Sequence, residues 1–173
     1  QVGAFTTAQV EALSTAQVDA LTTAQAAALK ATQLAALTTA QVQAIGTDDV
    51  AALTSAQLAG MGSTQLAALT TSQVNVLTST QIRALTSTQI ASLESEELRA
   101  LNTAQVAVLS TSQVGALSTA QIGQMETADV RAINTTSLKS LSSTQIEALA
   151  TAQVQALSTA QVKALETAQV QAL

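Results

Sequence analysis

The chain has 173 residues, of which 47% are hydrophobic and 1% aromatic, and its formal net charge is −5. Six basic residues cannot neutralise the phosphates of a nucleic acid partner, and the lack of cysteine and histidine removes disulfides and the commonest metal ligands. Aliphatic content without aromatic side chains favours a thin core shared along a stack of repeats over the bulky centre of a globule.

The chain opens with a five-residue partial unit, residues 1–5, and then repeats one eight-residue unit without insertion or deletion. From Thr6 to Leu173 it divides into 21 octads with the consensus S/T-T/S-A-Q-V/I/L-x-A-L. Position five is aliphatic except at Ala26, where it is alanine, and position eight is always Leu, Ile or Met. We interpret residues 1–173 as a single continuous repeat domain and as a fragment of a longer array.

The spacing of positions five and eight distinguishes three backbones. In one long α-helix the aliphatic stripe would drift by about 80° per octad, so no partner could cover it. In a β-strand the two positions would point to opposite faces. One short helix per octad places them on the same face, at i and i+3. We therefore expect an all-α solenoid of short helices, with a β-solenoid that turns a corner in each octad as the alternative.

The charges suggest how many octads form one coil. Of the 17 charged residues, 14 lie in even-numbered octads, including Arg83, Arg99 and Arg131. If alternate octads differ in exposure, each coil contains two octads, or 16 residues. We therefore predict two repeats per coil.

Positions five and eight also predict the core. Their branched side chains should point together into one dry seam along the array. Position seven is mostly alanine, so small side chains there should let neighbouring helices approach closely, and the variable position six should face solvent. The residues chosen to represent the core are Val18, Leu21, Val42, Leu53, Ile82, Leu85, Leu117 and Leu149.

The hydroxyl pair at positions one and two predicts the start of each helix. If position one is the N-cap, a unit such as Thr22 to Gln25 forms a capping box, in which the glutamine returns a hydrogen bond to the cap. If position two is the N-cap, its near-uniform Ser or Thr is explained, and Gly46 at position one ends the preceding helix. We favour position two. The caps chosen on this basis are Thr15, Thr23 and Thr39.

The glutamine at position four has two candidate roles. Its side chain can cap its own helix, or its amide can bond the next coil and so form a ladder along the array. Candidates for these roles are Gln17, Gln25, Gln41, Gln57, Gln73, Gln89 and Gln105.

No residue is assigned a catalytic, cofactor-binding or metal-binding role. The acidic clusters at residues 48–49 and 94–97 lack the glycine-rich loop of a calcium site, and we interpret them as solvated helix starts. Catalytic carboxylates need a pocket that shifts their pKa values, and a smooth stack provides none. We therefore expect neither an enzyme nor a cofactor. The longest apolar runs cover four residues, too few for a membrane span.

Phrases such as LTTAQVQAI (residues 37–45) and LSTAQVKAL (residues 157–165) are similar to octapeptide arrays of very long bacterial surface and secreted proteins described as adhesin-like. The resemblance covers the whole chain, although many such arrays carry proline in an LTPEQ unit and this chain has no proline. It implies an extracellular or cell-surface filament, stalk or spacer.

The expected partner is a second copy of the chain, by end-to-end or lateral assembly. The alternative function is a module that binds a lattice, such as ice or a polysaccharide, through rows of Thr and Ser, and a glycan or other surface ligand is then the partner.

Overall fold

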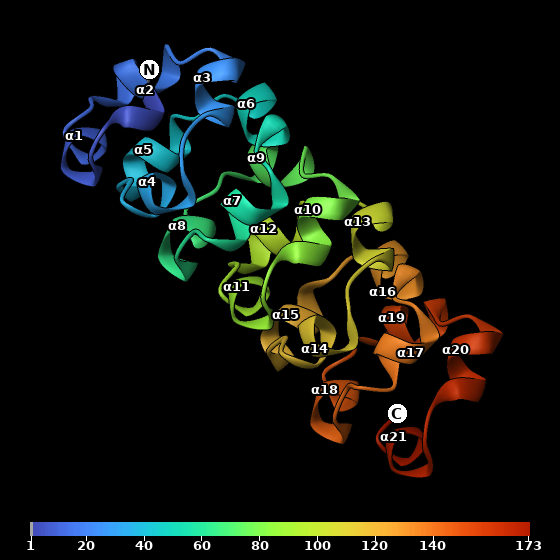
Figure 1. Ribbon diagram of the computed structural model, residues 1–173. Helices are drawn as coiled ribbons and strands as arrows, with labels where there is room; N and C mark the ends of the chain where they lie inside the picture. The colour runs from blue at the N-terminus through green and yellow to red at the C-terminus, as the bar shows by residue number, and fades with distance from the viewer. Residues whose placement is uncertain (1) are drawn as a thin grey trace. The chain divides into compact units, whose positions relative to one another are not determined.

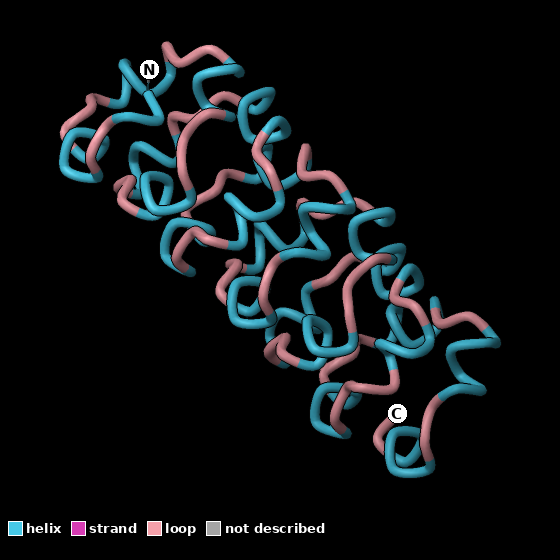
Figure 2. The backbone as a smooth tube through the Cα atoms, viewed as in Figure 1, coloured by secondary structure: helices cyan, strands magenta, loops and turns pink. Residues whose placement is uncertain are grey.

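The computed structural model describes residues 2–173, and this part of the chain is all α-helical (Figures 1 and 2). A short 3₁₀ helix, η1 (Val2–Ala4), precedes 21 α-helices, one in each octad. No strand occurs within residues 2–173, so the prediction of an all-α solenoid is confirmed and the β-solenoid alternative is wrong. The helices form two compact units, Gln1–Leu85 and Thr86–Leu173, and each is described by itself.

Every α-helix begins at position two of its octad and ends at positions five to seven. The first unit contains α1 (Thr7–Glu11), α2 (Thr15–Asp19), α3 (Thr23–Ala27), α4 (Ala31–Ala35), α5 (Thr39–Gln43), α6 (Thr47–Ala52), α7 (Ser55–Ala59), α8 (Ser63–Ala67), α9 (Thr71–Asn75) and α10 (Ser79–Ala84). The second unit contains α11 (Ser87–Ala91), α12 (Ser95–Arg99), α13 (Thr103–Ala107), α14 (Thr111–Gly115), α15 (Thr119–Gln124), α16 (Thr127–Ala132), α17 (Thr135–Leu138), α18 (Ser143–Glu147), α19 (Thr151–Ala156), α20 (Thr159–Ala164) and α21 (Thr167–Gln171).

The corners between helices are extended residues at positions eight and one. At one such corner Leu53 has φ −61° and ψ 142°, and Thr54 has φ −71° and ψ 154°. No residue from 2 to 173 has a positive φ. Gly46 and Gly62 are therefore not left-handed helix ends, as we expected for Gly46, but extended N-caps of the helices that follow.

Stacking joins each helix to the third helix along the chain, so one coil contains three octads and 24 residues. In the first unit α1, α4, α7 and α10 form one row, α2, α5 and α8 a second, and α3, α6 and α9 a third (Figure 1). In the second unit the rows are α11, α14, α17 and α20; α12, α15, α18 and α21; and α13, α16 and α19. The prediction of two octads per coil is wrong. Helices three octads apart alternate between odd and even numbers, so the parity of the charged octads carries no structural meaning.

Aliphatic side chains from positions five and eight meet inside each coil. In the first unit they enclose an apolar cavity of about 10 Å³, lined by residues of both positions from all three rows, among them Val10, Val18, Ala26 and Leu34. Of the representative core residues, Val18, Val42, Leu53, Ile82, Leu85, Leu117 and Leu149 are buried, whereas Leu21 is partly exposed. Leu21 lies in the first coil of the array, where no complete coil precedes it.

Close approach between stacked helices explains the small residue at position seven. A Cβ atom added at Gly60 would lie 2.6 Å from the Cβ of Ala31 in the helix stacked below it. That separation is far shorter than van der Waals contact, so α4 and α7 pack at this distance only because residue 60 has no side chain.

Replacing Ala26 with valine should stabilise the first unit. Ala26 is buried against the apolar cavity, and the equivalent site in neighbouring octads holds a larger aliphatic side chain. Two added methyl groups should raise the free energy of unfolding by about 1 kcal/mol, measured by urea unfolding. Ala27→Val, an exposed change in the same helix, is the control. Equal effects of the two changes would contradict the cavity argument.

Candidate functional site: a glutamine ladder between coils

One glutamine side chain performs both of the roles expected for position four. The Oε1 atom of Gln41 accepts a hydrogen bond from the backbone N–H of Thr38, 2.8 Å away, at the start of its own helix. Its Nε2 atom donates to carbonyl oxygens of the preceding coil, those of Val10 at 3.1 Å, Glu11 at 3.0 Å and Leu13 at 2.6 Å. The buried amide therefore caps one helix and ties that helix to the coil below.

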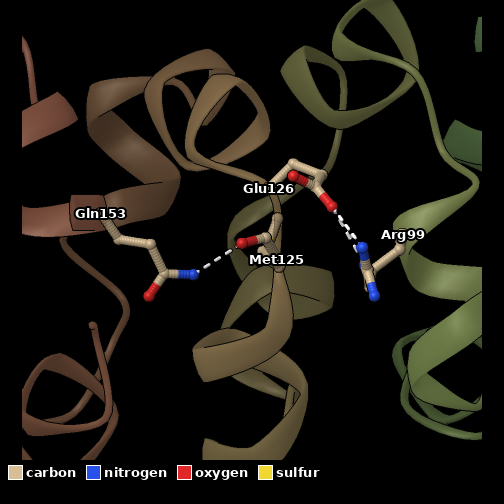
Figure 3. Close-up of polar contacts among 4 residues, drawn as sticks. All are labelled: Arg99, Met125, Glu126 and Gln153. Carbon is tan, nitrogen blue, oxygen red and sulfur yellow. Dashed lines mark hydrogen bonds and ion pairs between the residues drawn. The ribbon is translucent and has the colours of Figure 1, made fainter. Parts of the chain in front are cut away.

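The same contact recurs in both units at a constant spacing of 28 residues, from position four to the position-eight carbonyl of the fourth octad before it. In Figure 3, Gln153 donates to the carbonyl oxygen of Met125 at 2.7 Å, and it donates to Ile122 at 2.9 Å. We call these glutamines the glutamine ladder. Its members with printed inter-coil bonds are Gln33, Gln41, Gln57, Gln65, Gln73 and Gln81 in the first unit, and Gln121, Gln145, Gln153, Gln161 and Gln169 in the second.

The remaining predicted glutamines also take part in caps. Gln17 and Gln25 are exposed in the first coil, and each accepts a hydrogen bond from its N-cap at 2.8 Å. Gln89 and Gln105 are buried and accept from their N-caps at 2.8 and 2.7 Å. Capping is thus common to all of them, whereas burial requires a coil on the preceding side.

The N-cap is position one, and our preference for position two is wrong. Ser14 and Thr22 have extended backbones, and their side chains accept from the N–H of the glutamine three residues later. The glutamine returns the bond, which completes the capping box. A cap at position two would leave that reciprocal bond unmade. Thr15, Thr23 and Thr39 are the first helical residues, and their side chains are exposed.

A compensated replacement occurs where Ser137 stands at the glutamine position. Its hydroxyl donates to the carbonyl oxygen of Leu109 at 2.9 Å. Asn134, the N-cap of the same helix, also donates to Leu109, at 3.1 Å, and accepts from the N–H of Ser137 at 2.8 Å. The two short side chains together replace one glutamine, a role that our sequence analysis did not assign to them.

Acidic residues replace the ladder glutamine at Asp49, Glu97 and Asp129. An ionised carboxylate can accept the cap hydrogen bond but cannot donate to a carbonyl of the preceding coil. Asp129 is buried, and within residues 2–173 the Oε2 atom of Glu97 is buried without a hydrogen-bond partner. Burial raises the pKa of the Asp129 carboxyl above its ordinary value, and the nearby charge of Glu126 raises the pKa further.

Replacing Asp129 with asparagine should remove a pH dependence of stability. Because the native pKa of Asp129 is raised, its contribution to stability is fully present below the unfolded-state pKa and is lost as the pH rises through the native pKa. Asp129→Asn stays neutral and should be more stable than the natural chain by about 1 kcal/mol at neutral pH, but no more stable in acid. Thermal unfolding across this pH range tests the change.

The control for that experiment is Asp48→Asn, which changes an exposed acid in α6. Its effect on the melting temperature should be small and should not grow with pH. A stabilisation by Asp129→Asn that is the same in acid as at neutral pH would contradict the prediction.

A surface ion pair joins the two acidic octads of the second unit. The guanidinium of Arg99 donates to Oε1 of Glu126, at 2.6 Å from Nη2 and 3.1 Å from Nε (Figure 3). Both side chains are about half exposed, so solvent and salt screen the pair, and its net contribution is below about 1 kcal/mol. Within residues 2–173 no three acidic side chains gather in a way that could hold a metal ion.

The fold and the ladder agree with a known repeat. The sequence pattern of the family described as the ALTTAQ repeat matches overlapping segments that together cover the whole chain. None of the curated proteins matches the sequence. In residues 2–173 no helix is both long and apolar enough to cross a bilayer. The matched segments are residues 1–31, 27–55, 42–79, 50–87, 59–95, 90–125, 122–159 and 147–173.

Proposed function

The chain belongs to the ALTTAQ repeat family, and from this premise we propose that it is a structural spacer or stalk segment, which holds other parts of an assembly apart. The observation that carries the proposal is the glutamine ladder. Each coil is fixed to the one before it by buried amide-to-carbonyl hydrogen bonds, and the same bonds recur from coil to coil in both units. Such nearest-neighbour fixation gives length in proportion to the number of repeats.

The tolerance of position six supports a structural role. Its occupants include Glu11, Arg83, Gln155 and Gly115, and the first three are exposed. Side chains that change freely without disturbing the ladder are what a spacer requires, because its surface only needs to remain solvated.

We place this spacer on a bacterial surface or in a secreted protein. The support is the similarity of its octads to the arrays of long bacterial surface proteins. Localisation of the native protein by antibody labelling of intact cells tests this placement, and label found only after lysis would contradict it.

A length series tests the spacer proposal. Residues 102–125 span one complete coil of the second unit and can be duplicated once, twice and three times. We expect the maximum dimension from small-angle X-ray scattering to grow by a constant increment of about 8–10 Å per added coil, the usual distance between packed helices. The matched control inserts Gly/Ser segments of the same lengths, whose span grows with the square root of length. Increments that follow the control would overturn the proposal.

A row of exposed threonines favours a second candidate function, binding to a regular lattice. Thr23, Thr47 and Thr71 occupy position two of α3, α6 and α9, which stack in successive coils. All three are exposed, and their hydroxyls make no hydrogen bond to other residues in the range 2–173. Cosedimentation with ice or insoluble polysaccharide tests this candidate, which requires that Thr47→Tyr weaken the binding and that Thr135→Tyr, in another row, leave it unchanged.

A further inference from the structure

The two faces of a coil carry opposite halves of the ladder. The face toward the N-terminus presents amide donors, because every ladder glutamine reaches back along the chain. The face toward the C-terminus presents the carbonyl oxygens at positions five and eight that accept those amides. A coil face is therefore complementary to the opposite face of another coil and not to itself.

The first coil shows the donor face uncovered. Gln9, Gln17 and Gln25 are exposed, and their Oε1 atoms accept the cap hydrogen bonds at 2.8 Å. Within residues 2–173 their Nε2 atoms donate to no acceptor, whereas Gln33 and Gln41 in the next coil do. Three amide donors are thus available at this face.

The last coil shows the acceptor face uncovered. The carbonyl oxygens of Leu117, Met125, Ile133 and Leu141 each accept a ladder amide. In the described part of the chain, no side chain donates to the carbonyls that continue this series. Those carbonyls belong to Leu149, Leu157 and Leu165.

The acceptor face is also the most apolar exposed surface of the second unit. Val162 and Val170 are 44% and 49% exposed, although Val106 and Val114 at the same position of inner octads are 0% exposed. An inner coil covers these valines with the next coil, so the same covering by another copy would bury them and pair the free amides with the free carbonyls.

We propose that the donor face of one chain docks on the acceptor face of a second copy, in the geometry of two successive coils. The interface is heterologous, so repeated docking gives open, head-to-tail chains and not closed dimers. This is a property of coil faces, wherever an array of this kind ends. It extends the spacer role proposed above, but a spacer need not polymerise, so the two proposals can fail separately.

The test uses sedimentation velocity on the 173-residue chain over a range of concentrations. The mass of the unaltered chain should rise continuously with concentration. Val162→Asp places a charge on the exposed acceptor face, and Gln17→Glu replaces a free donor amide with a carboxylate on the donor face. Each variant alone should remain monomeric. Val76→Asp, at a site 36% exposed at position seven in the first unit, is the control and should associate like the unaltered chain.

Mixing the two blocked variants distinguishes head-to-tail docking from other association. The Val162→Asp chain retains its donor face and the Gln17→Glu chain retains its acceptor face, so an equimolar mixture should form dimers and nothing larger. A mixture that stays monomeric, variants that associate like the unaltered chain, or an unaltered chain that remains monomeric at every concentration would each overturn the proposal. In the last case a constant increment in the scattering series would still support the spacer.

Discussion

Replacing Gln73 with glutamate should lower the free energy of unfolding by about 3–5 kcal/mol at neutral pH. Gln73 is 1% exposed, and its Nε2 atom donates to the carbonyl oxygens of Val42 at 2.9 Å and Ile45 at 2.7 Å. The substitution keeps the shape of the side chain and its cap bond to Thr70. It turns the two inter-coil attractions into repulsions between a buried carboxylate and carbonyl oxygens.

Urea unfolding monitored by circular dichroism measures this change. Gln17→Glu is the matched control, because Gln17 makes the same capping box but is exposed and has no printed bond to another coil. Its cost should be below about 1 kcal/mol, measured at low protein concentration. Acid should restore part of the stability of Gln73→Glu, since a protonated carboxyl group can donate. Equal costs at the two sites would mean that the glutamine acts only as a cap.

Replacing Val114 with aspartate should destabilise the second unit by more than about 4 kcal/mol. Val114 is fully buried at position five of α14, where only aliphatic side chains of the coil interior surround it. The core is thin, so a charge there cannot reach water without displacing stacked helices. Because each coil is stabilised by its neighbours, the damage should spread to the helices stacked on either side, α11 and α17.

Hydrogen exchange followed by mass spectrometry locates that damage, and thermal unfolding gives its size. The matched control is Val162→Asp, the same substitution at the same octad position, where the side chain is 44% exposed. We expect it to change stability by no more than about 1 kcal/mol. If both variants unfold alike, position five does not owe its importance to burial between coils.

The local structure was predictable from sequence because it depends on neighbours within one octad. Val18 and Leu21 are three residues apart, and that spacing alone favours a short helix with one apolar face. The capping box was also visible, as in Thr22 and Gln25, but the near-uniform hydroxyl at position two drew the assignment to the wrong residue. Position two holds the first helical residue, and its conserved-looking hydroxyl at exposed sites such as Thr23 has no structural partner that explains it.

The number of octads per coil was not predictable in the same way. It depends on the angle between successive helices, which the extended residues at corners such as Leu53 and Thr54 determine. All octads share this corner, so no local pattern marks where a coil closes. The inter-coil half of the ladder was anticipated only as a candidate role, because a hydrogen bond from Gln41 to Leu13 joins residues 28 positions apart.

The paired replacement of Asn134 and Ser137 had a usable signal. Asparagine at position one coincides with serine at position four in the same octad, and no other octad combines these two residues. A shortened donor beside a cap with an amide is what the geometry needs to keep the Leu109 carbonyl bonded.

The three-sided coil has a consequence for arrays whose length varies. Each side of the coil is one octad, so the gain or loss of a single octad leaves later coils closed but shifts every later residue to the next side. A pair such as Arg99 and Glu126 would then lose its register, whereas the ladder would re-form because every octad carries the same parts. Variation by single octads therefore selects among three directions in which the downstream chain departs, and variation by whole coils alters reach while leaving direction unchanged.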